Sequence, residues 1–292
     1  MSSSSSSNHN TVELQDRLDV LFRQETTFYL TSDYLGALIQ KQQHKAVDDS
    51  RSSGSNNSKM LNQHWREVMC EWAYHVVDHF DFPRDIVSAC MSFLDRYLAH
   101  HVERHPEGIP KHAFQLLAMT CLYIAVKLDQ PRMLSLETMA HLSRGTFSKA
   151  QMQAMEMEIL TNLNWHVHPP TPYTFLSYFI QLSKPNPAAS KIYEMARYFV
   201  ELSVLDYYFV GKQASTVAIA ALMNAFEDHL SYEDLSVFVA PGQDELVRDC
   251  QARLRSLYNV PDQSVFDQGS GAPQQPIYGR TSSPTCVTQN IM

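Results

Sequence analysis

The chain has 292 residues, of which 44% are apolar and 18% charged, a composition typical of folded proteins with one or two domains. Its net charge of −8 removes the general attraction to phosphate backbones and anionic lipid that basic proteins have. The start of the chain lacks the pattern of a signal peptide, no 18 apolar residues run together, and the five cysteines are scattered without C-x-x-C spacing. We therefore expect an intracellular protein with reduced thiols and protein partners, no cofactor, no membrane association and no nucleic-acid ligand.

Apolar residues recur at steps of three and four along most of the chain, which predicts an all-α fold. Residues 1–11 are mostly serine and are expected to be disordered, whereas residues 12–47 are expected to form a helical extension. Residues 48–59 are rich in Ser, Asn and Gly and lack a large apolar side chain, so we interpret them as a polar linker.

Five helices are predicted over residues 60–165. Pro83 separates the first from the second. The third, at residues 113–128, is apolar on every side, which is typical of a helix surrounded by others. Ser148 and Gln151 have the spacing of a capping box, which would open the fifth helix.

A second unit is predicted over residues 166–258, because the helical pattern begins again after the prolines of residues 167–173. Its own all-round apolar helix, at residues 215–226, follows the first one by about 100 residues, as in a duplicated unit. Residues 259–292 lose all periodicity and are expected to form a disordered tail. The predicted architecture is two tandem five-helix units with an N-terminal helical extension.

Several segments resemble the cyclin family in the order that the family has them. Residues 65–98 (WREVMCEWAYHVVDHFDFPRDIVSACMSFLDRYL) look like the opening of a cyclin box, and residues 114–128 (FQLLAMTCLYIAVKL) look like its buried third helix. Residues 154–176 resemble its fifth helix and exit, and residues 201–210 resemble the second repeat. Residues 21–35 are similar to the lead-in of D-type and plant- or alga-like cyclins.

The resemblance implies two cyclin-box domains, at residues 60–165 and 166–258, in a protein that binds and activates a cyclin-dependent serine/threonine kinase. It further implies cell-cycle control, with kinase substrates or inhibitors as further partners and a location in the nucleus, the cytoplasm or both. The sequence has no Gly-rich phosphate loop, H-R-D or D-F-G motif, so the chain is not expected to be an enzyme.

Two charged pairs follow from the resemblance. Arg66 and Asp95 match a structural ion pair, and each lies at the edge of its helix's apolar stripe, although periodicity alone allows both to be solvated. Lys127 and Glu156 match the kinase-binding pair. Glu156 falls within the apolar stripe of its helix, about 160° from Glu158, and a carboxylate there needs a cation. The alternative for Lys127 is an interaction with its own helix C-terminus.

A substrate-docking groove is implied at Met69, Trp72 and Gln115, together with Arg66. Met69 and Trp72 also lie on the core stripe, so core packing is an equal alternative. The motif departs from the family at Trp65 and His75, which puts docking of basic substrate motifs in doubt.

Ser283 precedes Pro284 and is a candidate site for a proline-directed kinase. The sequence also bears on other classes of function. The histidine spacings are too weak to predict a metal site. A transcription factor IIB-like DNA-binding protein would need a basic face that this chain lacks. A cyclin-fold scaffold, or a cyclin of transcription or nutrient signalling, stays open as the alternative.

Overall fold

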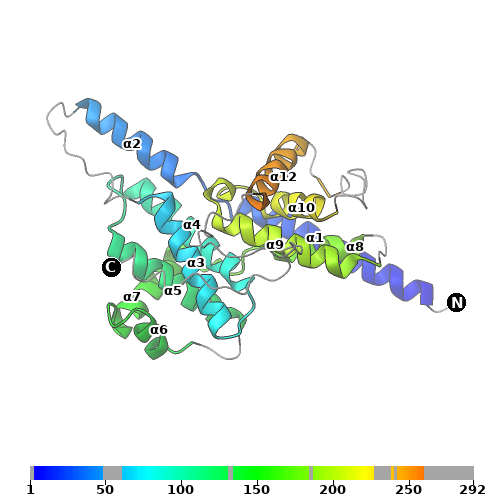
Figure 1. Cartoon of the computed structure of the whole chain (residues 1–292), viewed down its shortest axis with the longest axis horizontal. Coiled ribbons are helices and arrows are strands. Elements are labelled where there is room, and N and C mark those ends of the chain that lie inside the picture. The colour runs from blue at the N-terminus through cyan, green and yellow to red at the C-terminus, as the bar shows by residue number, and fades with distance from the viewer. Residues whose placement is uncertain are drawn as a thin grey trace, which may run out of the picture.

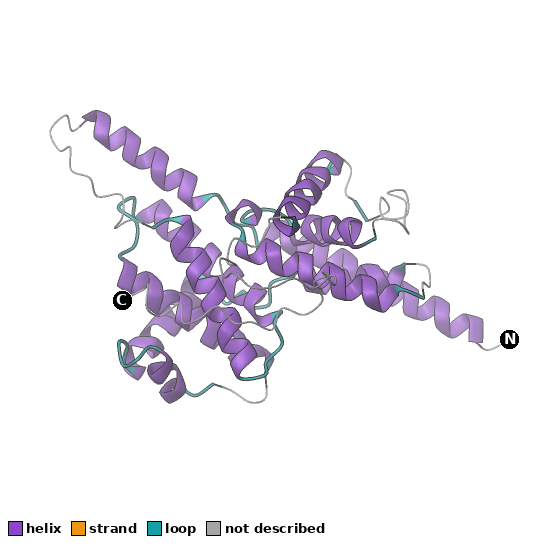
Figure 2. Ribbon diagram, in the orientation of Figure 1, coloured by secondary structure: helices purple, strands orange, loops and turns teal. Residues whose placement is uncertain are grey.

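The computed structural model describes residues 3–48, 61–130, 134–183, 187–226, 238–239 and 242–259. All the regular elements in these ranges are helices, as Figures 1 and 2 show, which confirms the predicted fold class. Among them, none is long and apolar enough to cross a membrane. The elements are α1 (Ser3–Thr27), α2 (Tyr34–Asp48), α3 (Gln63–His79), α4 (Ile86–Arg104), α5 (Lys111–Asp129), α6 (Leu136–Leu142), α7 (Lys149–Asn162), α8 (Pro172–Leu182), α9 (Ala189–Leu205), a short 3-10 helix η2 (Tyr207–Phe209), α10 (Ala214–Ala225) and α12 (Asp244–Tyr258).

Helices α3 to α7 form the first five-helix unit. Helix α5 is its centre, and every residue from 116 to 126 is buried, as its all-round apolar pattern predicts. The Asn62 side chain caps α3 by accepting from the backbone N–H of Trp65. The capping box is also present: Ser148 accepts from the backbone of Gln151, whose side chain bonds back to the backbone of Ser148.

The second unit contains α8, α9, α10 and α12 among its described residues. Helix α10 takes the central place that α5 has in the first unit, with residues 215–222 buried. Residues 227–237 lie outside the described residues, so the fifth helix predicted for this unit is not tested. The tail from residue 260 onward, which includes Ser283, also lies outside them.

The N-terminal extension differs from the expectation in one respect, which we correct here. Residues 3–11, predicted to be disordered, belong to α1. Leu18 is fully buried, and the Phe22 ring lies 5.3 Å from that of Phe175 on α8. Packing of Leu18 and Phe22 holds the second half of α1 in a helical conformation. Once these turns are formed, extending the helix toward the N-terminus costs little free energy. Helix α2 projects from the body (Figure 1), and of the predicted linker at residues 48–59 only Asp48 is described.

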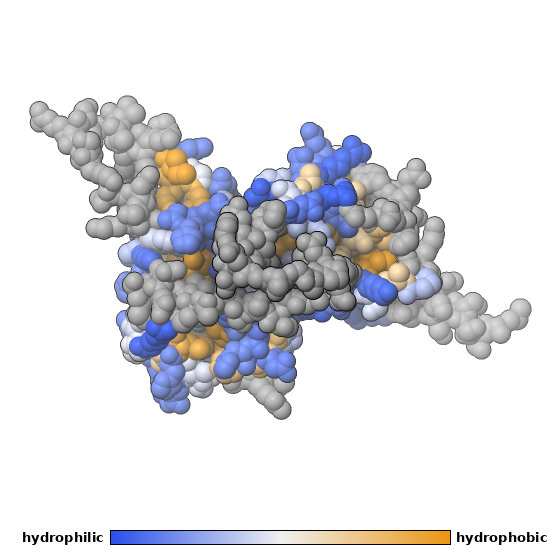
Figure 3. Space-filling model, in the orientation of Figure 1, coloured by the Kyte–Doolittle hydropathy of each residue, from blue (hydrophilic) through white to orange (hydrophobic). Residues whose placement is uncertain are grey.

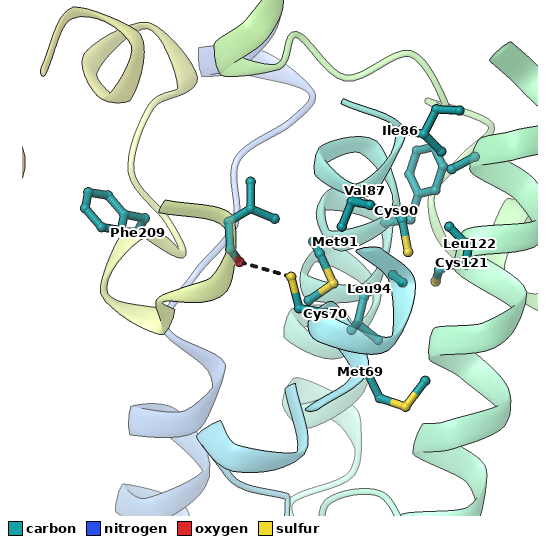
Figure 4. Packing of buried hydrophobic residues seen from close by; sticks show 14 of the residues in the cluster. Met69, Cys70, Ile86, Val87, Cys90, Met91, Leu94, Cys121, Leu122 and Phe209 are labelled. Carbon is teal, nitrogen blue, oxygen red and sulfur yellow. Dashed lines mark hydrogen bonds between the residues drawn. The ribbon is translucent and has the colours of Figure 1, made fainter. Parts of the chain in front are cut away.

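The core runs without interruption through both units. Figure 4 shows part of it, where Met69, Cys70, Cys90 and Met91 pack between α3, α4 and α5. The Cys70 thiol points toward the Val204 carbonyl of α9, at 3.7 Å, so that the first unit contacts the second directly. Polar side chains cover much of the face drawn in Figure 3, and apolar residues show on α2.

Candidate functional site

Arg66 on α3 and Asp95 on α4 form a buried, two-pronged ion pair. The guanidinium donates from Nε to Oδ1 at 2.9 Å and from Nη2 to Oδ2 at 2.8 Å. The two residues are only 3% and 6% exposed. The Asp95 charge and its hydrogen bonds outweigh the effect of burial and raise the pKa of Arg66, so the arginine stays charged. The solvated alternative for this pair does not fit the structure.

The same arginine also reaches the second unit. Its Nη1 donates to the carbonyls of Val204 and Leu205, at 2.9 and 3.1 Å, in the last turn of α9. These carbonyls belong to the group that an α-helix leaves without internal partners. Asp95 in turn accepts from the hydroxyl of Tyr34 on α2, at 2.9 Å. The pair therefore joins both units and the N-terminal extension.

Lys127 and Glu156 meet at the surface of the first unit, where α5 ends beside α7. The Lys127 ammonium donates to Glu156 Oε1 at 2.8 Å and lies 5.6 Å from the ring centroid of Tyr123. The Glu156 side chain is 15% exposed and that of Lys127 is 43% exposed. The hydrogen bond to Glu156 raises the pKa of Lys127. The ammonium of Lys127 can therefore be reached from the surface, while the more buried Glu156 holds it from the protein side.

Glu158, placed on the polar side of α7 by its 160° offset, is exposed, as expected. It nevertheless accepts a hydrogen bond from the Tyr97 hydroxyl on α4. Helical periodicity therefore predicts correctly that Glu156 and Glu158 lie on opposite faces of α7, but it does not predict the hydrogen bond between Glu158 and Tyr97.

Trp165, which follows α7, is a surface residue that the sequence analysis missed. It is 60% exposed, and its φ of +60° is rare for a bulky side chain. Asn164 before it also has a positive φ, and the Trp165 N–H donates to the Leu160 carbonyl. The sequence did offer one indication that Trp165 is exposed: it is an aromatic residue directly after the end of a predicted helix and belongs to no apolar stripe. The turn that ends α7 therefore leaves this ring exposed at the surface.

Other exposed apolar side chains surround this region. Phe28, after α1, is 54% exposed and stacks on the His166 ring at 4.7 Å. Leu128, next to Lys127, is 41% exposed and lines a cleft with Val167. The ends of α5 and α7 thus present charged and apolar groups together.

The predicted docking groove has little open apolar surface. Met69 is 4% and Trp72 9% exposed, and Gln115 is half-buried. This burial fits the core alternative, and substrate docking at these residues stays a prediction. In the part of the chain that the structure describes, no group of three or more His, Cys, Asp or Glu side chains is arranged to hold a metal ion.

Two family models match the chain. The one described as "Cyclin, N-terminal domain" covers residues 33–168, and the one described as "Cyclin, C-terminal domain" covers residues 170–280. Helix α1 lies outside both. The ranges place the boundary between the two domains at the proline-containing segment that follows α7.

Curated relatives match at low identity. G2/mitotic-specific cyclin-B2 of Gallus gallus is 26% identical over 193 residues, which are 66% of this chain and 46% of that protein. Cyclin-A2-3 of Arabidopsis thaliana is 26% identical over 170 residues, 57% of this chain and 36% of that protein. The chain therefore spans less than half the length of these relatives.

Two solved structures share the fold. A viral cyclin from herpesvirus saimiri superposes with a TM-score of 0.54 at 14% identity, covering 76% of this chain and 96% of that one. A chain of the yeast RNA Pol II CTD kinase CTDK-1 complex gives a TM-score of 0.51 at 12% identity, covering 85% and 86%. At these identities the likeness concerns the fold alone.

Proposed function

Because the chain belongs to the cyclin family, we propose that it is a regulatory subunit that binds and activates a cyclin-dependent serine/threonine protein kinase. The observation that carries the proposal is the ion pair of Lys127 and Glu156, at 2.8 Å on the surface of the first unit. By the resemblance, these two positions match the kinase-binding pair of the family. Phosphoryl transfer then belongs to the kinase, and this chain is not an enzyme.

The mechanism follows from the rigidity of the helical surface. By the resemblance, the first cyclin box docks on the small lobe of the kinase and pushes its mobile regulatory helix inward, which completes the ion pair that orients ATP. The cyclin need not change shape. It shifts the kinase toward its active conformation in proportion to its higher affinity for that conformation.

Each group on the surface has a role in this proposal. Glu156, mostly buried, fixes the ammonium of Lys127, whose remaining N–H groups can donate to the kinase. The exposed rings of Trp165 and Phe28 supply apolar contact area, since aromatic side chains dominate the energetics of many interfaces. Arg66 and Asp95 support this surface indirectly, because their hydrogen bonds hold α3, α4 and α9 in their relative positions.

We further propose a role in cell-cycle control. This role is supported by relatives named as G2/mitotic-specific cyclins. With this role we propose that the protein is located in the nucleus, the cytoplasm or both. The relatives compared are A- and B-type by name, so the D-type or plant-like character of residues 21–35 stays a prediction. Ser283 stays a candidate phosphorylation site.

Retention of purified kinases on the immobilised chain tests the proposal. A panel of cyclin-dependent kinases of both cell-cycle and transcription classes is offered to the wild type and to the Lys127→Ala/Glu156→Ala double variant. The matched control is Lys149→Ala/Glu137→Ala, which removes another Lys–Glu pair from the same unit with the same change in charge.

We expect the wild type and the control to retain a kinase, and the Lys127→Ala/Glu156→Ala variant to retain at least tenfold less. Melting curves verify that all three proteins are folded. If the wild type retains no kinase from the panel, the proposed function is wrong. Equal retention by all three proteins would keep the function and reject the assigned contact pair.

A further inference from the structure

A pocket of about 130 Å³ lies where the two units meet the N-terminal extension. Three connecting segments line it: residues 29–31 after α1, residues 169–172 between the units, and residues 209–214 before α10. Helix α4 and the end of α9 complete its walls. Two of the segments are in close contact, since a Cβ added to Gly211 would lie 2.9 Å from the carbonyl oxygen of Thr31. The pocket therefore depends on all three parts of the chain.

The buried charged groups of this pocket already have partners. Arg66 and Asp95 are bonded to each other, and Glu25 accepts from the backbone and hydroxyl of Ser215. These charged residues are 6% exposed or less. They therefore leave little for a polar ligand to satisfy. Apolar side chains supply much of the other lining, among them Met91, Pro170, Val204, Phe209 and Val217.

An aromatic ring matches this space in size. An apolar cavity of about 150 Å³ holds a benzene molecule, which is as large as the ring of a phenylalanine side chain. The pocket of this chain is comparable, at about 130 Å³. Burying such a ring removes apolar surface from water, which favours its binding.

Lys212 adds a charge to the requirements for an occupant. It lines the same pocket and is half-buried. Its ammonium lies 5.1 Å from the ring centroid of Tyr208, which is 37% exposed, and it forms no ion pair with the residues that the structure describes. This contact leaves the N–H groups of the ammonium available to a carboxylate. An aromatic residue with an acidic neighbour therefore fits both features of the pocket.

The chain itself carries such a pair beyond α12. In residues 260–292 an aromatic residue is followed directly by an acidic one at a single position, Phe266 with Asp267. The other aromatic residue of this part, Tyr278, has no acidic neighbour. The match to the C-terminal cyclin domain extends to residue 280 and so includes Phe266 and Asp267. The family model thus counts these two residues with the second domain.

The end of α12 brings this part of the chain close to the pocket. Figure 1 shows α12 beside α10, and Arg253 on α12 lies 5.8 Å from the same Tyr208 ring that Lys212 contacts. From Arg253 the helix continues for about 8 Å to its end. Residues 260–266 span about 23 Å when extended, which is more than enough to return Phe266 over that length. A connection this short also keeps the entropy cost of closure small.

We propose that Phe266 occupies this pocket and that Asp267 pairs with Lys212. The segment after α12 then acts as a clasp across the two units and the N-terminal extension. Burial of the ring supplies the affinity, and the ion pair selects Phe266 over Tyr278. The inference goes beyond the proposed function and needs no kinase.

Digestion of the full chain with chymotrypsin tests the clasp, because this protease cleaves after accessible aromatic residues. Mass spectrometry follows cleavage after Phe266, with cleavage after Tyr278 as an internal reference. A synthetic peptide of residues 256–284 gives the ratio of the two rates without the pocket.

Charge reversal tests the ion pair in the same assay. The variants are Lys212→Glu, Asp267→Lys and the two combined, and Lys191→Glu at the exposed start of α9 is the control. Proteins that carry Asp267→Lys are compared with a peptide that has the same substitution. Melting curves verify that each protein is folded.

We expect the ratio of cleavage after Phe266 to cleavage after Tyr278 to be about fivefold lower in the wild type than in the peptide, because docking lowers the population that the protease can cut. Lys212→Glu and Asp267→Lys should each remove about two thirds of this protection, because like charges then face each other. The combined variant should restore it, and Lys191→Glu should leave it unchanged.

A wild-type ratio equal to that of the peptide would overturn the inference. Protection that persists in both charge reversals would overturn the placement of Asp267 beside Lys212. Should Lys212→Glu fail to fold, the wild type and Asp267→Lys still decide the matter. The assay contains no kinase, so its result is independent of the proposed function.

Discussion

Removing the carboxylate of Asp95 is the sharpest test of how the two units are joined. In Asp95→Ala, the Arg66 guanidinium loses two hydrogen bonds and its counter-charge while it remains 3% exposed, and the Tyr34 hydroxyl loses its acceptor. Breaking a buried pair in this way costs about 3–5 kcal/mol, because a buried charge is left uncompensated. This is a large share of the total stability of a typical protein.

The assay is urea unfolding followed by circular dichroism, with melting curves as a second readout. We expect the free energy of unfolding to fall by about 3–5 kcal/mol and the melting temperature by roughly 10 °C. The matched control is Asp78→Ala, which breaks the exposed Arg84–Asp78 pair and should change the stability by less than about 1 kcal/mol.

A double variant separates the pair from its other contacts. Arg66→Met/Asp95→Leu replaces both charges by apolar groups, which is far less costly than leaving one of them alone. The double variant should therefore lose less stability than the two single variants together, by about 0.5–3 kcal/mol. A loss below about 1 kcal/mol in Asp95→Ala, or strictly additive single variants, would refute the reasoning.

Three further predictions concern the extension and the thiols. Glu25 accepts from the backbone and hydroxyl of Ser215 at the start of α10, so Glu25→Ala should cost about 1–2 kcal/mol. Burial raises the pKa of Glu25 in the folded protein, so urea unfolding should show its contribution largest below pH 4.5 and shrinking as the pH rises toward 7. Gly211 has a φ of +82°, and an added Cβ would lie 2.9 Å from the Thr31 carbonyl oxygen, so melting curves should show Gly211→Ala to be destabilised by more than about 1 kcal/mol. Burial raises the pKa of four thiols, those of Cys70, Cys90, Cys121 and Cys250. In a Cys286→Ser background, mass spectrometry should show that these thiols resist alkylation at pH 8 until urea unfolds the chain.

The apolar periodicity of the sequence was sufficient to predict where the helices lie and which face of a helix is buried. It placed Glu156 within the stripe of α7, and the structure leaves that side chain only 15% exposed. It also identified α5 and α10 as central helices, because a helix buried on all sides needs apolar residues on all sides.

Contacts between distant segments could not be foreseen from periodicity. The position of Arg66 at the edge of the apolar stripe of α3 indicated that this side chain needs a partner. It did not indicate that Nη1 of Arg66 donates to the carbonyls of Val204 and Leu205, which lie 138 and 139 residues away in the sequence. The helical start of α1 was missed because a serine run carries no apolar pattern of its own. Trp165 was missed because it belongs to no helix, and its exposure depends on the turn that holds it.

Kinase activation is the central claim, and stimulation of a purified kinase tests it most directly. The rate of histone H1 phosphorylation by a retained kinase is measured alone, with the wild-type chain, and with Lys127→Ala/Glu156→Ala at equal concentrations. We predict that the wild type raises the rate at least a hundredfold, equivalent to about 2.7 kcal/mol of stabilisation of the active conformation, and that the double variant raises it at least tenfold less. A kinase that binds the wild-type chain without any gain in rate would contradict the claim and leave the chain as a scaffold.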